Sequence, residues 1–171
     1  MICFFPDELT DVSRSVLLRF DLDSFPIYVK EKDQISNNEV MFQLEIPSIN
    51  LKEDVYIMNS VWNDVNYHVE LLEDSDLSRN ILFLAAHSGN GSSSYFNDLV
   101  MLEKGDIVLV EYTSERYYYE VEDIYSIVKN GYMKIENNLR NVLYLITCSL
   151  EDKKRQIVVQ SRLIYRESFV N

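Results

Sequence analysis

The stretch that decides the fold lies in the last third of the chain, where two strongly β-prone runs flank a polar loop. It reads VLYLITC over residues 142–148, SLEDKK over residues 149–154 and RQIVV over residues 155–159. Branched and aromatic residues suit a pleated, buried surface, and two such runs around a short polar loop predict an antiparallel hairpin. If the runs pair in this way, Cys148 and Arg155 face one another across the mouth of the hairpin, with Cβ atoms ~4.5–5.5 Å apart.

A thiol beside a guanidinium has a chemical consequence. The thiolate is the nucleophile, and a nearby positive charge lowers the pKa of a thiol below its usual ~8.5. Arg155 stays charged, and its rigid fork of donors could hold a substrate carbonyl or a developing oxyanion. At this spacing an inert buried cysteine beside a surface arginine is the commoner arrangement, so the motif alone leaves both interpretations open.

A second apolar run ends in a histidine. Residues 81–86 read ILFLAA, and His87 follows at the start of the small polar loop 88–94. A continuous apolar run of this length predicts a strand buried on both faces. His87 at its end could exchange a proton with an amine, or it could simply cap the strand or fill the core. His68 has no comparable setting and is interpreted as structural.

The rest of the chain predicts a mainly β protein. Twelve Tyr and eight Phe favour sheet. Further strands are predicted at residues 40–46, 54–58, 107–112, 117–123, 124–128 and 156–165, and helices at residues 7–20, at residues 61–71 and after Ser92–Ser94. Many short strands at this spacing indicate a closed barrel or a sandwich. We expect residues 1–39 to form an N-terminal helix and connection, and residues 40–171 to form one catalytic domain.

Composition limits the classes of function. The 171 residues fit one domain, and the net charge of -12 disfavours nucleic acid and anionic membranes as partners. Two cysteines and two histidines without a CxxC pair argue against a zinc site. No metal or other cofactor is therefore expected. No run approaches the ~18 apolar residues that would span a bilayer.

The order of the candidate residues distinguishes between families of cysteine enzymes. Papain-like enzymes place the cysteine before the histidine, and the caspase motif Gln-Ala-Cys-x-Gly is absent around Cys148. The chain instead resembles the sortases, transpeptidases of Gram-positive cell surfaces. The matching segments are Ile46–Ile49, Ala85–Ser88, Tyr95–Leu99, Leu102–Ile107, Leu145–Cys148 and Arg155–Val159. Ala86 stands where many sortases have glycine, and the short Cys148–Arg155 spacing assigns no subclass.

The resemblance implies a fold and an activity. The expected fold is a closed sortase-type β-barrel of about eight strands with a few short helices, plus the N-terminal helix. His87, Cys148 and Arg155 would be catalytic. The enzyme would cleave an LPxTG-like sorting signal through a thioester on Cys148 and pass the acyl group to an amine of a peptidoglycan precursor or a pilin. It would act at the extracellular face of the cell membrane, with a membrane anchor expected in the full-length protein but absent from this chain.

Two other functions stay open at this point. A cysteine peptidase would pass the same acyl group to water. A non-catalytic β-barrel module would bind a surface peptide or glycan without forming a covalent intermediate. Transfer of the acyl group to an added amine distinguishes a transpeptidase from a peptidase. Selective labelling of the thiol by a substrate mimic distinguishes either enzyme from a non-catalytic binding module.

Overall fold

The computed structural model describes residues 13–17, 39–136 and 138–169. Its strands are β1 (Ser13–Leu17), β2 (Val40–Ile46), β3 (Leu51–Tyr56), β4 (Glu70–Leu71), β5 (Ile81–Ala85), β6 (Ile107–Glu111), β7 (Glu115–Val128), β8 (Tyr132–Glu136), β9 (Val142–Cys148) and β10 (Arg155–Ser168). Its helices are the 3-10 turns η2 (Pro47–Ile49), η3 (Leu77–Arg79) and η4 (Asn97–Met101).

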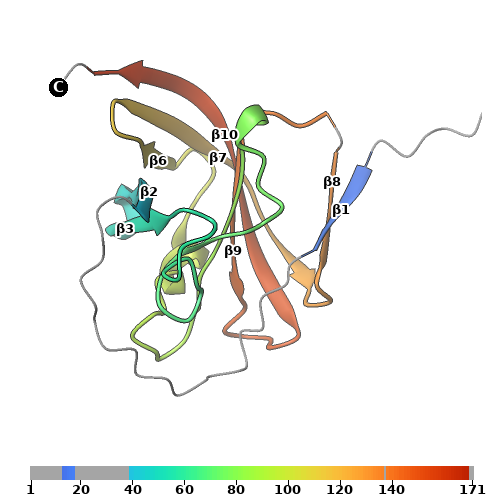
Figure 1. The fold of residues 1–171 in the computed structure, drawn as a ribbon. Coiled ribbons are helices and arrows are strands. Elements are labelled where there is room, and N and C mark those ends of the chain that lie inside the picture. The colour runs from blue at the N-terminus through green and yellow to red at the C-terminus, as the bar shows by residue number, and fades with distance from the viewer. Residues whose placement is uncertain (1–12, 18–38, 137, 170–171) are drawn as a thin grey trace, which may run out of the picture.

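Eight of the strands form one sheet in the order β3-β2-β6-β7-β10-β9-β5-β4. A parallel bridge between Val55 and Val69 brings the two ends of this sheet together, so that it curls into a nearly closed barrel (Figure 1). Closure removes most of the unpaired strand edge that would otherwise invite aggregation. The predicted mainly β barrel with a few short helices is confirmed.

Strands β5 and β9 lie side by side and run parallel, with Ile81 opposite Val142 and Ala85 opposite Ile146. Successive side chains on a strand point to opposite faces. Leu82, Leu84, Leu143 and Leu145 therefore join one core cluster, while their neighbours on β5 and β9 join a second cluster. The two-sided burial predicted from the apolar run 81–86 is confirmed.

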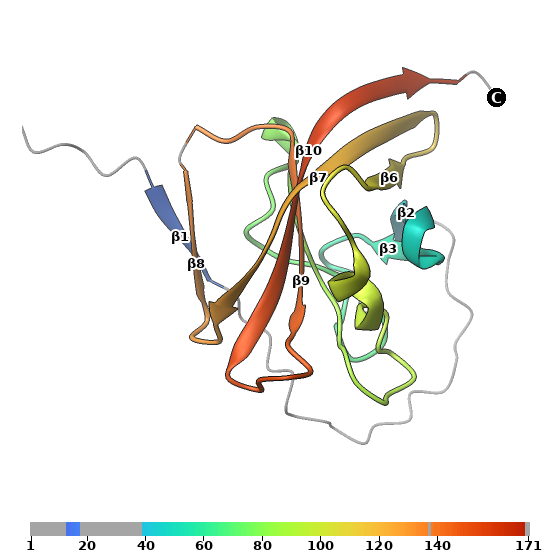
Figure 2. The ribbon, with the colours of Figure 1, turned by 180° about the vertical axis from the view of Figure 1, so that it is seen from behind.

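The second cluster is completed by β8, whose Met133 and Ile135 are buried in it. Both views place the β1–β8 pair on the far side of β7, β9 and β10 from strands β2, β3 and β6 (Figures 1 and 2). Residues 13–17 pair antiparallel with β8. The predicted helix over residues 7–20 is therefore wrong at residues 13–17, and the rest of that range lies outside the described residues. A partner strand distant in the sequence overrides local helical spacing here.

Two other predictions of secondary structure are wrong. Residues 61–71 form turns leading into β4 instead of a helix. The Asn63 side chain both donates a hydrogen bond to the Leu71 backbone and accepts one from it, which favours the turns. Its Nδ2 donates to the Leu71 carbonyl at 2.9 Å, and its Oδ1 accepts from the Leu71 N–H at 2.7 Å. The strands predicted at residues 117–123 and 124–128 are parts of the single long strand β7.

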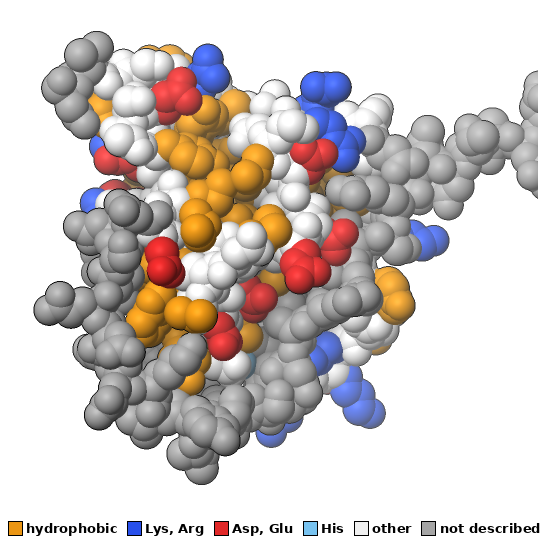
Figure 3. All heavy atoms as spheres, viewed as in Figure 1, with side chains coloured by type: hydrophobic (Ala, Val, Ile, Leu, Met, Phe, Trp, Pro, Cys, Tyr) orange, Lys and Arg blue, Asp and Glu red, His pale blue; other side chains and the backbone are white. Residues whose placement is uncertain are grey.

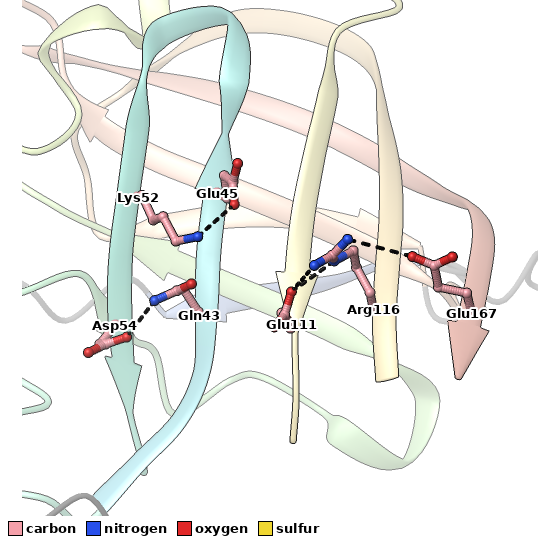
Figure 4. Close-up of polar contacts among 7 residues, drawn as sticks. All are labelled: Gln43, Glu45, Lys52, Asp54, Glu111, Arg116 and Glu167. Atoms are coloured by element: carbon pink, nitrogen blue, oxygen red, sulfur yellow. Dashed lines mark hydrogen bonds and ion pairs between the residues drawn. The ribbon is translucent and has the colours of Figure 1, made fainter. Parts of the chain in front are cut away.

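Polar pairs link neighbouring strands on the outer surface (Figure 4). On β2 and β3, Lys52 pairs with Glu45 at 3.1 Å and Gln43 donates to Asp54 at 3.1 Å. Arg116 on β7 binds Glu111 and lies 3.7 Å from Glu167. Acidic side chains are spread over the face seen in Figure 3 instead of gathering in one cluster. Within the described part of the chain, no helix has the length and apolar character needed to cross a membrane.

Candidate active site

The ends of two parallel strands bring His87 and Cys148 to the same edge of the sheet. β9 ends at Cys148, and β5 ends at Ala85, two residues before His87. Parallel strands share a direction, so the residues that follow their carboxyl ends emerge together. The sequence predicted both strand ends, and the parallel pairing explains why residues so distant in the sequence meet.

Three hydrogen bonds tie the two strand ends together. The backbone N–H of Ala86 donates to the Ile146 carbonyl at 3.3 Å. The buried hydroxyl of Thr147 donates to the Ala86 carbonyl at 2.8 Å, and the Ser88 hydroxyl donates to the Cys148 carbonyl at 2.7 Å. The backbones on either side of His87 and Cys148 are therefore fixed relative to one another.

A pocket of about 490 Å³ lies over this edge, and both His87 and Cys148 line it. His87 is 7% exposed, and Cys148 is half-buried against the second core cluster. The remaining walls come from Asn66, from the loop after His87 and from the loop after Cys148, as follows: Ser88, Gly89, Asn90, Gly91, Ser92, Ser93, Ser94, Ser149, Leu150 and Lys153. A thiol and an imidazole that line one concave, partly enclosed site are the residue types that nucleophilic acyl transfer uses.

The register of the β9–β10 hairpin differs from the prediction by one residue. Cys148 lies opposite Gln156, and the Ser149 N–H donates to the Arg155 carbonyl at 3.0 Å. Gln156 is 2% exposed, and no described residue donates to its Oε1. The expectation that Cys148 and Arg155 face one another directly is wrong.

Arg155 is the candidate that the structure does not bring into the pocket. Its Nε donates to the Ser126 hydroxyl and its Nη2 to the Ser126 carbonyl, both at 2.7 Å. Arg155 is not among the residues that line the pocket, whereas Lys153 is. His68 also lies outside the pocket lining, and its ring packs against Tyr56 and Trp62 with centroids 4.7 and 5.9 Å away.

Comparison with known proteins places this architecture in a family. The sortase domain model matches residues 44–164, which is more than half of the chain. The chain belongs to the sortase family. Its members are cysteine transpeptidases associated with the surfaces of Gram-positive bacteria, and the family resemblance stated from the sequence is confirmed.

Individual sortases are distant relatives. Sortase A of Bacillus anthracis is 23% identical over 131 residues, which cover 76% of this chain and 62% of that protein. This chain therefore spans less than two thirds of the length of that relative. Sortase C1 of Streptococcus agalactiae superposes with a TM-score of 0.64 at 25% identity, covering 77% of this chain and 70% of the other. Sortase C of Streptococcus pneumoniae gives a TM-score of 0.64 at 22% identity, with coverage of 80% and 74%.

The sequence did not identify Asn66 as a residue of this sortase's pocket. Its Oδ1 lies 3.4 Å from His87 Nε2. Asp64 two residues earlier is typical of an Asx turn, in which a carboxylate accepts from the backbone N–H two positions later. That signal predicts a turn at residues 64–66, but the contact with His87 depends on how the whole 57–70 connection folds.

The conformation of the loop after His87 is fixed by hydrogen bonds from the Asn97 side chain. Asn97 Oδ1 accepts from the Gly89 N–H at 2.6 Å, and Asn97 Nδ2 donates to the Gly89 carbonyl at 3.0 Å. Gly89 has a φ of 129°, a conformation that side chains rarely adopt. The glycine and Asn97 together keep residues 89–94 as a wall of the pocket.

One carboxylate near the site has an unusual acidity. Burial, with smaller contributions from Asp64 and Glu73, raises the pKa of Glu70 to about 7. Glu70 lies opposite Ala85 in the β4–β5 pair, and its Oε2 accepts from the Val65 N–H at 3.2 Å. Glu70 thus supports the turn that carries Asn66, and its charge changes near neutral pH.

Proposed function

We propose that this sortase is an active cysteine transpeptidase in which Cys148 is the nucleophile and His87 carries the proton. The observation that supports this assignment is that both residues line one pocket at the carboxyl ends of adjacent parallel strands. Family membership supports the reaction type, and the pocket geometry supports the choice of residues.

In the first step, Cys148 Sγ attacks the scissile carbonyl of a peptide with an LPxTG-like sorting signal. A thioester forms and the peptide C–N bond breaks, while protonated His87 gives its proton to the departing amine. In the second step, the amine of an acceptor attacks the thioester. His87 takes the proton from that amine, a new amide forms and the Cys148 thiolate is released.

Arg155 has a role in this proposal as the donor that positions the substrate carbonyl. Its guanidinium must leave Ser126 to do so, because in the described structure it does not line the pocket. Both bonds to Ser126 lie at an exposed position where water can replace them, so the movement costs little free energy.

The substrates proposed for this chain follow from the family. The S. pneumoniae sortase C has been described in terms of its pilin substrate specificity. We propose a surface-protein sorting signal as the acyl donor and a peptidoglycan precursor or a pilin as the amine acceptor, at the extracellular face of a Gram-positive cell.

The test is mass spectrometry of the intact protein after mixing with a panel of sorting peptides. We expect an acyl adduct on Cys148 that disappears when an oligoglycine acceptor is added, with formation of the ligated peptide. Cys148→Ala should give no adduct, and His87→Gln should reduce turnover by about 10³-fold or more. Cys3→Ser and His68→Gln change the same residue types elsewhere and should retain the adduct.

The outcomes separate the alternatives. Only hydrolysed peptide in the presence of oligoglycine would indicate a peptidase. No labelling of Cys148 by any sorting peptide or by a peptide-like electrophile would favour a non-catalytic binding module. Full turnover by a folded Cys148→Ala protein would disprove the proposed nucleophile.

A further inference from the structure

Asn66 is held in a single orientation by three hydrogen bonds that do not involve His87. Asp64 Oδ1 accepts from the Asn66 backbone N–H and from Asn66 Nδ2, both at 2.9 Å. The Ser93 hydroxyl, from the loop after His87, donates to the Asn66 carbonyl at 2.7 Å. These bonds fix the backbone of Asn66 and also the rotation of its amide group.

The orientation of the amide decides which atom meets the imidazole. A carboxylate can only accept, so the NH₂ group of Asn66 must be the end that points to Asp64. The oxygen end is then left facing His87 Nε2 at 3.4 Å. An amide oxygen also only accepts, so the hydrogen of this contact belongs to Nε2.

We infer that Asn66 is a positioning residue that holds His87 in the tautomer protonated at Nε2 and so leaves Nδ1 as the nitrogen that exchanges protons with the thiol and the substrate amine. The inference deepens the function proposed above, because it assigns the two ring nitrogens their tasks. In a neutral imidazole one nitrogen donates and the other accepts, and the partner of the first decides the role of the second. In this chain Asp64 acts on His87 through Asn66.

The charge state of His87 should respond to the same contact. Cys148 and Lys153 line the same pocket as His87, while Asp64 binds Asn66 and Glu70 binds the Val65 N–H in the neighbouring 64–70 segment. Asn66 separates the Asp64 carboxylate from the imidazole. Exchanging the two residues would place the carboxylate directly against His87 without changing the net charge.

The chain is well suited to a direct test, since it contains two histidines only. Nitrogen–proton correlation spectra of the imidazoles, recorded on the full chain across a pH series, report the tautomer and the pKa of each ring. In the wild-type protein we expect neutral His87 to be protonated at Nε2. In Asn66→Leu we expect a mixture of tautomers, and in the exchange variant Asp64→Asn/Asn66→Asp a His87 pKa raised by about one unit or more.

His68 is the internal control, because it packs against aromatic rings and lies outside the pocket lining. Unchanged His68 signals in Asn66→Leu show that the fold is retained. In the exchange variant the His68 signals should move, because burial lowers the pKa of His68 and the Asp64 carboxylate acts to raise it. Glu70→Gln, recorded in parallel, removes the Glu70 carboxyl, whose pKa is raised to about 7 by burial. Neutral wild-type His87 protonated at Nδ1, or a tautomer ratio identical in the wild type and a folded Asn66→Leu, would overturn the inference.

The spectra need no turnover, so this result stands apart from the test of the proposed function. Where the protein transfers acyl groups, Asn66→Leu should lower kcat by about 10- to 100-fold with little change in KM. The exchange variant should restore part of kcat and shift the pH profile upward. A merely structural role for Asn66 would give neither the partial rescue nor the shift.

Discussion

At the scale of single residues, the two cations near Cys148 are placed in a way that the sequence did not reveal. Arg155 was predicted to face the thiol, yet it binds Ser126, and Lys153 lines the pocket instead. The reason is local to the hairpin loop. The Arg155 N–H donates to the Asp152 carbonyl at 2.9 Å, and the Asp152 N–H donates to Ser149 Oγ at 3.1 Å. This tight turn sets the strand register, which loop length alone could not fix.

A comparison of two substitutions of equal charge tests which cation serves the reaction. If Arg155 moves into the pocket with substrate, Arg155→Gln should lower kcat/KM by about 100-fold or more, as loss of an oxyanion donor does. Lys153→Gln should change kcat/KM by less than about fivefold, because a flexible exposed lysine gives little directional stabilisation. Steady-state kinetics with one peptide and one acceptor measures both, and the reverse order of effects would assign the role to Lys153.

At the scale of secondary-structure elements, the prediction was best where a strand is buried on both faces. The runs at residues 81–86 and 142–148 are almost entirely apolar, so the sequence pattern alone identified them as strands. The positions of His87 and Cys148 at the strand ends were predicted with them. It was poorest where distant partners decide the structure. Residues 13–17 form a strand because β8 is there to pair with them, and β8 itself was missed.

The hydrogen bonds between the ends of β5 and β9 should contribute measurably to the free energy of unfolding. Thr147→Val keeps the shape of a buried side chain but removes the hydroxyl that donates to the Ala86 carbonyl. We expect the free energy of unfolding to fall by about 1–3 kcal/mol, because a buried acceptor loses its donor. Urea unfolding at neutral pH measures the change.

Ser88→Ala is the matched comparison for that experiment. It removes the hydroxyl that donates to the Cys148 carbonyl, but at a half-buried position where water can replace the bond. Its cost should stay below about 1 kcal/mol. An equal or larger loss for Ser88→Ala would mean that burial of the Thr147 bond is not what makes it stabilising.

At the scale of the whole molecule, Glu70 should link stability to pH. In the folded protein the pKa of Glu70 is raised from 4.5 to about 7 by burial. Between these values the folded state keeps a proton that the unfolded chain has released, so stability falls as pH rises through this window. Glu70→Gln should remove the fall and raise the free energy of unfolding by about 2 kcal/mol at about pH 8, with little effect at about pH 5.

Urea unfolding of the two proteins at both pH values tests this expectation. Glu120→Gln makes the same change of charge at an exposed position on β7 and should leave the fall in stability in place. If Glu70→Gln and Glu120→Gln change the pH dependence of stability equally, the buried carboxylate is not its cause. General repulsion in a chain of net charge -12 would then explain the fall in stability.

The parallel pairing of β5 and β9 also has a consequence for when the site comes into existence. Parallel neighbours cannot be joined by a tight turn, and here residues 86–141, with three other strands among them, intervene between the two. Contacts between segments so distant along the chain form slowly, because the loop must be closed before they are made. Thiol and imidazole therefore meet only after most of the barrel has been built. A chain still emerging or still unfolded therefore carries an ordinary thiol without its proton carrier, and the paired site exists only in the folded protein.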